Sequence, residues 1–181
     1  MTRRAWLFAF VPLIAAVVVN QVYAAPLGQV RDALKQRYPL SRIEIQSQPN
    51  EGVVIERGAI LTLEADSVPA KKLRIIQANT KSPRFHVMDY ARVEIGTDGA
   101  LTAGRGDFAV AKGTRLVVLD LKVAADRVSL FTHTAEPVGR ADGKSVYGCT
   151  EFVFRFPGGA LERSDLAQVQ HVIEHWLPFA A

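Results

Sequence analysis

One stretch of the chain constrains its fold more than any other. Residues 114–134, TRLVVLDLKVAADRVSLFTHT, hold two runs of strand-forming residues on either side of the tripeptide AAD. Two such runs joined by a short turn are typical of a β-hairpin. Because side chains alternate between the faces of a strand, we expect two sets in the first strand: Leu116, Val118 and Asp120 on one face, and Val117, Leu119 and Leu121 on the other. In the second strand the alternating set is Val128, Leu130 and Thr132.

Further strand-like segments surround this hairpin. Before it come RIEIQ (42–46), GVVIERGAILTLEA (52–65), KKLRIIQA (71–78), RFHVM (84–88) and ARVEIGTDGALTAG (91–104), and after it comes SVYGCTEFVFRF (145–156). Gly58 interrupts the second segment, which indicates a bulge or a tight bend. Asp98 and Gly99 form an Asp-Gly pair, which favours a hairpin turn.

Helical patterns lie at the two ends of this strand-rich region. In PLGQVRDALKQRYPL (26–40), apolar residues recur at spacings of three and four, as on one helical face: Leu27, Val30, Leu34 and Tyr38. Pro26 suits a first helical turn and Pro39 ends the pattern, so we predict a helix over 26–38. After the turn-forming tripeptide PGG, a last helix is predicted to begin at Ser164, a good N-cap residue.

These patterns predict a mainly β (α+β) fold. We expect a small, curved antiparallel sheet or an SH3-like barrel, with an N-terminal and a C-terminal helix packed on it. No linker, internal repeat or low-complexity segment divides the chain. The prediction is therefore a single globular domain over residues 25–181, which is long enough to bury a substantial core.

The N-terminus has the pattern of a secretory signal peptide. Arg3 and Arg4 precede the apolar run AWLFAFVPLIAAVVV (5–19), and the small-residue sequence VYA ends at Ala24. This order of regions predicts removal of residues 1–24. The apolar run is shorter than the ~20 residues of a spanning helix, so an uncleaved anchor is the less favoured alternative and we expect no membrane span after cleavage. The protein is then periplasmic or secreted, by general secretion or by the twin-arginine route.

Charge and cysteine content narrow the possible partners. Removing Arg3 and Arg4 lowers the formal net charge from +4 to +2, and the remaining basic residues are scattered. That balance lacks the electrostatic footprint of nucleic-acid binding, so we expect no nucleic acid partner. Cys149 is the only cysteine, which excludes an intrachain disulfide. We expect its thiol to be buried in the core, with a disulfide to another chain as the alternative.

The stretch HVIEH (171–175) matches the pattern H-x-x-E-H, in which two histidines and a glutamate on one helix can build a hydrolytic zinc site. At about 100° per residue, the apolar residues of this helix form one face: Leu166, Val169, Val172, Ile173, Trp176 and Leu177. His171 and His175 lie roughly opposite this face, whereas a catalytic zinc needs ligands in a walled cleft and a third protein ligand.

The helical positions therefore favour a structural interpretation of HVIEH. We expect Trp176 to be buried, both histidines to be exposed, and no metal site. His171, Glu174 and His175 remain the candidate ligands of an alternative hypothesis, a small zinc-dependent hydrolase.

No complete catalytic or cofactor motif is present. The chain lacks a GxSxG elbow, a GxGxxG loop and a Walker loop, so we expect no catalytic residues and no cofactor. Aromatic side chains concentrate in the segment 145–156. Tyr147, Phe152 and Phe154 either pack in the core or line a groove for a lipid, a glycan or a peptide.

Three segments resemble a loose group of secreted bacterial proteins of unknown function. They are ALKQRYPLSRIE with VVIERGAILTL, FAVAKGTRLVVLDLKVAADRVSLFTHT, and YGCTEFVFRF with the helix that follows. In that group, a short helix ending in a Tyr-Pro-like stop precedes a G-A-V/I-L-x-L strand, and an aromatic residue and a glycine precede a strand pair. Gly58, Phe108 and Gly113 fit best. The resemblance implies an SH3-like curved barrel in an exported protein, and it supplies no catalytic residues.

The leading functional hypothesis is an exported cell-envelope protein that acts as a non-enzymatic binding or accessory module. Its expected partner is an envelope protein, a lipid or a glycan. The alternatives are the zinc-dependent hydrolase and an envelope assembly or interaction subunit. The sequence leaves the ligand and the oligomeric state open.

Overall fold

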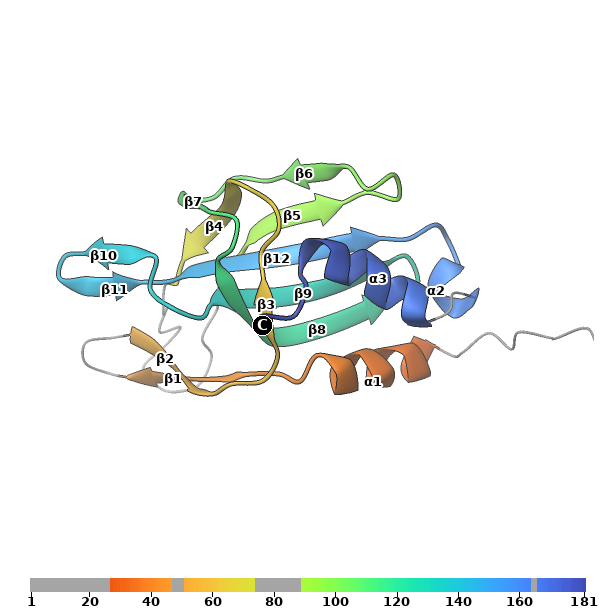
Figure 1. Cartoon of the computed structure of the whole chain (residues 1–181), viewed down its shortest axis with the longest axis horizontal. Coiled ribbons are helices and arrows are strands. Elements are labelled where there is room, and N and C mark those ends of the chain that lie inside the picture. Colours follow the sequence, from red (N-terminus) through yellow and green to blue (C-terminus); the bar gives the residue numbers. More distant parts are fainter. Residues whose placement is uncertain (1–26, 47–50, 74–88, 164–165) are drawn as a thin grey trace, which may run out of the picture.

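The structure of the protein is a computed structural model, which describes residues 27–46, 51–73, 89–163 and 166–181 (Figure 1). The predicted signal peptide, the strand over 84–88, most of the segment 71–78 and the N-cap Ser164 lie outside the described residues. Those four predictions therefore stay predictions.

Helices lie near the two ends of the chain, and strands lie between them, as the sequence patterns predict. The helices are α1 (Leu27–Arg37), α2 (Ala160–Arg163) and α3 (Leu166–Trp176). The strands are β1 (Arg42–Gln46), β2 (Glu51–Glu56), β3 (Ile60–Thr62), β4 (Val68–Lys72), β5 (Ala91–Ile95), β6 (Leu101–Ala103), β7 (Phe108–Val110), β8 (Arg115–Ala124), β9 (Arg127–Thr134), β10 (Gly139–Ala141), β11 (Lys144–Val146) and β12 (Gly148–Arg155).

One curled sheet forms the body of the protein, with strand order β3-β8-β9-β12-β4-β7. Strand β12 pairs with β4 through Gly148 and Cys149, and from Thr150 to Phe154 it pairs in parallel with β5, which in turn carries β6. The other pairings are antiparallel, including the separate hairpins β1–β2 and β10–β11 (Figure 1). The mainly β fold with a small curved sheet and terminal helices is therefore confirmed.

The predicted hairpin over 114–134 is confirmed as β8–β9, but both expected faces of its first strand are wrong beyond Val118. The register between these strands shifts between Val118 and Asp120, so Leu119 is an extra residue in a bulge. A bulge reverses the alternation beyond it and bends the strand. Leu121, and not Asp120, therefore joins Leu116 and Val118 in the core. Val128 and Leu130 pack in the same core, as predicted.

Both terminal helices pack their apolar faces on this sheet. Val30, Leu34 and Tyr38 are at most 4% exposed, which confirms the predicted stripe of α1. From α3, Val169 and Ile173 enter the same core. None of the described helices is long and apolar enough to cross a membrane.

The residues after α3 complete the edge of the sheet. The amide of Thr62 in β3 donates to the Pro178 carbonyl at 2.7 Å, and the amide of Ala180 donates to the Ile60 carbonyl at 2.9 Å. The ring of Phe179 stacks on Tyr38, with 5.5 Å between the ring centroids. The C-terminal segment thus covers an edge strand and joins α1 to β3.

Gly58 allows a close approach of two backbone segments. Its amide donates to the Ser41 hydroxyl at 2.8 Å, and the next amide, of Ala59, donates to the Pro39 carbonyl at 2.7 Å. A Cβ atom at Gly58 would lie 2.1 Å from that carbonyl oxygen. The predicted interruption at Gly58 is therefore a place where the chain after α1 lies against the chain before β3.

We predict that Gly58→Ala lowers the free energy of unfolding by at least about 2 kcal/mol, because backbone atoms cannot rotate out of the way of the new methyl group. Chemical denaturation measures the change. Gly28→Ala is the matched control, since a Cβ at Gly28 in α1 meets no atom within 4 Å. Equal stabilities of the two variants would contradict the close approach at Gly58.

Candidate functional site

A groove of about 550 Å³ lies between the two C-terminal helices and the turn that joins β5 to β6, over the end of β12. This volume is within the usual range of small-molecule sites. Its apolar lining comes from strand ends and helices: Ile95, Phe156, Pro157, Ala160, Val172 and Trp176. These side chains form an apolar surface that a ligand can cover.

Polar side chains add to the lining of the groove: Thr97, Arg155, Arg163, Gln168, His171 and His175. On α3, the groove residues 168, 171, 172, 175 and 176 recur at helical spacing, so they form one stripe beside the core stripe. None of the described lining residues is acidic. The groove thus combines an apolar surface with basic and neutral polar groups, and we name it the α3 groove.

The wall opposite α3 is the β5–β6 turn. Its shape comes from the predicted Asp98–Gly99 pair: Gly99 has φ +77°, a conformation that glycine adopts readily. The Asp98 carboxylate accepts a hydrogen bond from the Ala100 amide at 2.9 Å, and the Gly96 amide donates to the Ala100 carbonyl at 2.8 Å. The Asp98 carboxylate is therefore engaged within its own turn.

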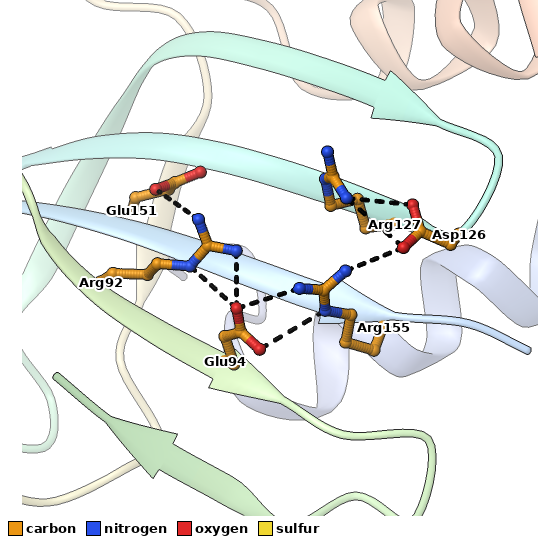
Figure 2. Close-up of polar contacts among 6 residues, drawn as sticks. All are labelled: Arg92, Glu94, Asp126, Arg127, Glu151 and Arg155. Atoms are coloured by element: carbon orange, nitrogen blue, oxygen red, sulfur yellow. Dashed lines mark hydrogen bonds and ion pairs between the residues drawn. The ribbon is translucent and has the colours of Figure 1, made fainter.

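An ion-pair network holds β5, β12 and the β8–β9 turn together next to this wall (Figure 2). Arg155 donates to Glu94 through Nη2 at 3.1 Å and to Asp126 through Nη1 at 2.8 Å. Arg92 also donates to Glu94, through Nη2 at 2.6 Å. The hydrogen bonds from Arg155 and then Arg92 lower the pKa of the Glu94 carboxyl. Because two carboxylates hold its guanidinium, Arg155 brings no unpaired charge to the groove.

Arg163, at the end of α2, is a different kind of cation. Its Nη2 donates to the Gly158 carbonyl at 3.0 Å, and no carboxylate of the described residues pairs with it. The side chain is exposed and lines the groove. A guanidinium has five N–H donors and stays protonated in proteins. Most of its donors are therefore available to a ligand.

The structure separates the members of the HVIEH pattern. His171 and His175 are exposed, as expected, and both line the α3 groove. Glu174 points to α1 instead, where it accepts hydrogen bonds from Arg37 at 2.9 and 3.1 Å. No group of three metal-ligating side chains gathers among the described residues. Trp176 is half-buried and packs against the core, which confirms only part of its expected burial.

Of the three aromatic residues proposed as a groove, two lie together in the core and the third packs elsewhere. Phe152 and Phe154 are 1% and 0% exposed and pack inside the core. Tyr147 stacks on His133 instead, with 4.8 Å between the ring centroids. His133 is paired with Cys149 across strands β9 and β12. Both residues lie on the face of the sheet opposite Phe152 and Phe154. The α3 groove uses Phe156 from this segment.

His133 and Cys149 are buried together on the face of the sheet opposite the main core. His133 is fully buried, and its Nδ1 donates to the Thr134 carbonyl at 2.7 Å. Nε2 is then the unprotonated ring nitrogen of His133, and it has no hydrogen-bond partner among the described residues. Burial lowers the pKa of His133 to about 4 and raises that of the Cys149 thiol to about 12. Cys149 is fully buried, as predicted, so its thiol is neither accessible nor activated.

Sequence reasoning did not find Arg163, Gln168 or Thr97. Thr97 stands in a turn and Arg163 in a helix of one turn, and neither segment is long enough for a periodicity that indicates which side chains meet. Gln168 was detectable, because it continues the stripe of His171 and His175 by one helical turn.

No protein-family model, curated protein or solved structure matches the chain.

We predict that His133 makes the protein less stable as the pH falls from 6.5 to about 4. In this window the unfolded chain binds a proton at His133 and the folded protein does not, so unfolding becomes more favourable. Between pH 7 and pH 4.5, the free energy of unfolding should fall by about 2–3 kcal/mol more in the wild type than in His133→Gln.

Urea denaturation at the two pH values measures this difference. His171→Gln is the control, because it makes the same substitution at an exposed histidine. If His133→Gln and the wild type lose the same stability, His133 is not the buried neutral group described above.

Proposed function

We propose that the protein is an exported, non-enzymatic binding module of the cell envelope, and that its ligand binds in the α3 groove. The observation that carries this proposal is the composition of the groove. An apolar surface bordered by a few hydrogen-bonding side chains is the usual composition of a small-molecule site. The ligand is accordingly a molecule with a substantial apolar part.

The described side chains support binding over catalysis. A nucleophilic site needs an activated Ser or Cys beside a base, whereas burial raises the pKa of Cys149. A zinc hydrolase needs the glutamate of HVIEH beside the metal as its base, whereas Arg37 holds Glu174 on another side of the helix. The zinc-dependent hydrolase therefore gains no support from the placement of these groups.

Export and the finer fold class belong to the same proposal. The N-terminal sequence supports removal of residues 1–24 and a periplasmic or secreted location. The curled sheet supports the SH3-like arrangement that the sequence resemblance implies. A fusion of residues 1–30 to alkaline phosphatase, which is active only after export, tests the location: activity is expected, and an inactive, expressed fusion would contradict export.

We predict saturable binding of the neutral apolar dye N-phenyl-1-naphthylamine in the α3 groove. The chain has two tryptophans, Trp6 and Trp176, so the exported protein retains only Trp176, which lines the groove. Energy transfer from Trp176 to the dye therefore reports binding close to the site. Val172→Glu should weaken binding at least about tenfold, because it puts a charge on the apolar surface.

Val138→Glu is the matched control, since Val138 is 42% exposed and does not line the groove. Its dye affinity should equal that of the wild type, and circular dichroism should show that both variants are folded. If the wild type does not bind the dye saturably, or if both variants bind it equally well, the α3 groove is not the binding site.

A further inference from the structure

We propose that the ligand of the α3 groove is a single-chain amphiphile with a negatively charged head group, a phosphate or a carboxylate, which Arg163 binds. This inference rests on the proposed function and specifies the ligand class. It starts from the separation of the groove into an apolar surface and a polar edge. The apolar surface requires a ligand with an apolar chain. The polar edge, formed by Thr97, Arg163, Gln168, His171 and His175, selects the head group.

The polar edge is rich in hydrogen-bond donors. Arg163 has five N–H groups and no acceptor, and each neutral imidazole of His171 and His175 donates one N–H and accepts at its other ring nitrogen. A phosphate or carboxylate is an acceptor-only group, so it matches this edge. The hydroxyls of a sugar are both donors and acceptors, and among the polar side chains at this edge Gln168 and Thr97 are the ones that offer a neutral oxygen.

Four of the carboxylates near the groove are already engaged. Glu94 and Asp126 hold Arg155, Asp98 accepts from its own turn, and Glu174 holds Arg37. None of these four carboxylates pairs with Arg163, whose one hydrogen bond among the described residues goes to the Gly158 carbonyl. Within the part of the chain that the structure describes, Arg163 is therefore a cation without a carboxylate partner, and it is complementary to an anionic head group.

The apolar surface explains why a free anion does not suffice. Trp176 and Val172 on α3 face the groove beside His175 and His171, and Phe156 lines it at the end of β12. These side chains are half-buried or buried, and a bound alkyl chain would remove their remaining apolar area from water. Binding energy from the chain adds to the charge-assisted hydrogen bonds of the head group.

The test compares ligands that share one chain and differ in head-group charge. Dodecyl phosphate, dodecyl maltoside and dodecyltrimethylammonium are titrated into the exported protein below their micelle concentrations, by calorimetry. Dodecyl phosphate should bind at least about tenfold more tightly than the other two, and high salt should reduce this preference. Inorganic phosphate alone should not displace the dye from the groove.

Arg163→Gln should weaken binding of dodecyl phosphate about tenfold and leave binding of dodecyl maltoside unchanged. Arg140→Gln is the matched control, because Arg140 is an exposed arginine of β10 outside the groove. Equal affinities for the three amphiphiles, or an unchanged affinity in Arg163→Gln, would overturn the head-group assignment. If the head-group assignment fails but the wild type still binds the dye, the proposed function stands without that assignment. If the wild type does not bind the dye either, both the head-group assignment and the proposed function are refuted.

Discussion

Strand β12 is the element on which the rest of the structure depends. It pairs with β9 along seven register positions, with β4 at its first residues and with β5 from Thr150 onward. Both of its faces are buried, because Phe152 and Phe154 enter the core while Cys149 and Val153 are covered on the other side. A strand with so many partners fixes the register of its neighbours.

The α3 groove is a consequence of this arrangement. Arg155 ends β12 and bridges Glu94 and Asp126, which ties the parallel strand β5 to the β8–β9 turn (Figure 2). The β5–β6 turn therefore stands at a defined place beside the chain that leaves β12. On the other side, α3 uses three faces: an apolar face in the core, Glu174 towards Arg37 of α1, and the stripe with His171 and His175 towards the groove. The histidines of HVIEH thus belong to the border of the α3 groove.

Local patterns predicted the elements better than their contacts. The stripe of α1 and the hairpin β8–β9 were predictable because each shows a clear period over many residues. The bulge at Leu119 was not predictable, because no residue type in this run of apolar residues marks the place of the extra residue. The bulge reverses the alternation of the side chains from Asp120 onward. The parallel pairing of β5 with β12 depends on residues about 60 positions apart, which no local pattern reports. The groove depends on that pairing, so Thr97 and Arg163 were invisible to sequence reasoning.

The proposals place a ligand with an apolar chain between α3 and the β5–β6 turn. A crystal structure of the exported protein grown with dodecyl phosphate would show where this ligand binds. We expect the alkyl chain to lie against Trp176 and Val172, with its phosphate within hydrogen-bonding distance of Arg163. Dodecyl phosphate bound on another surface, with the α3 groove empty, would contradict this placement.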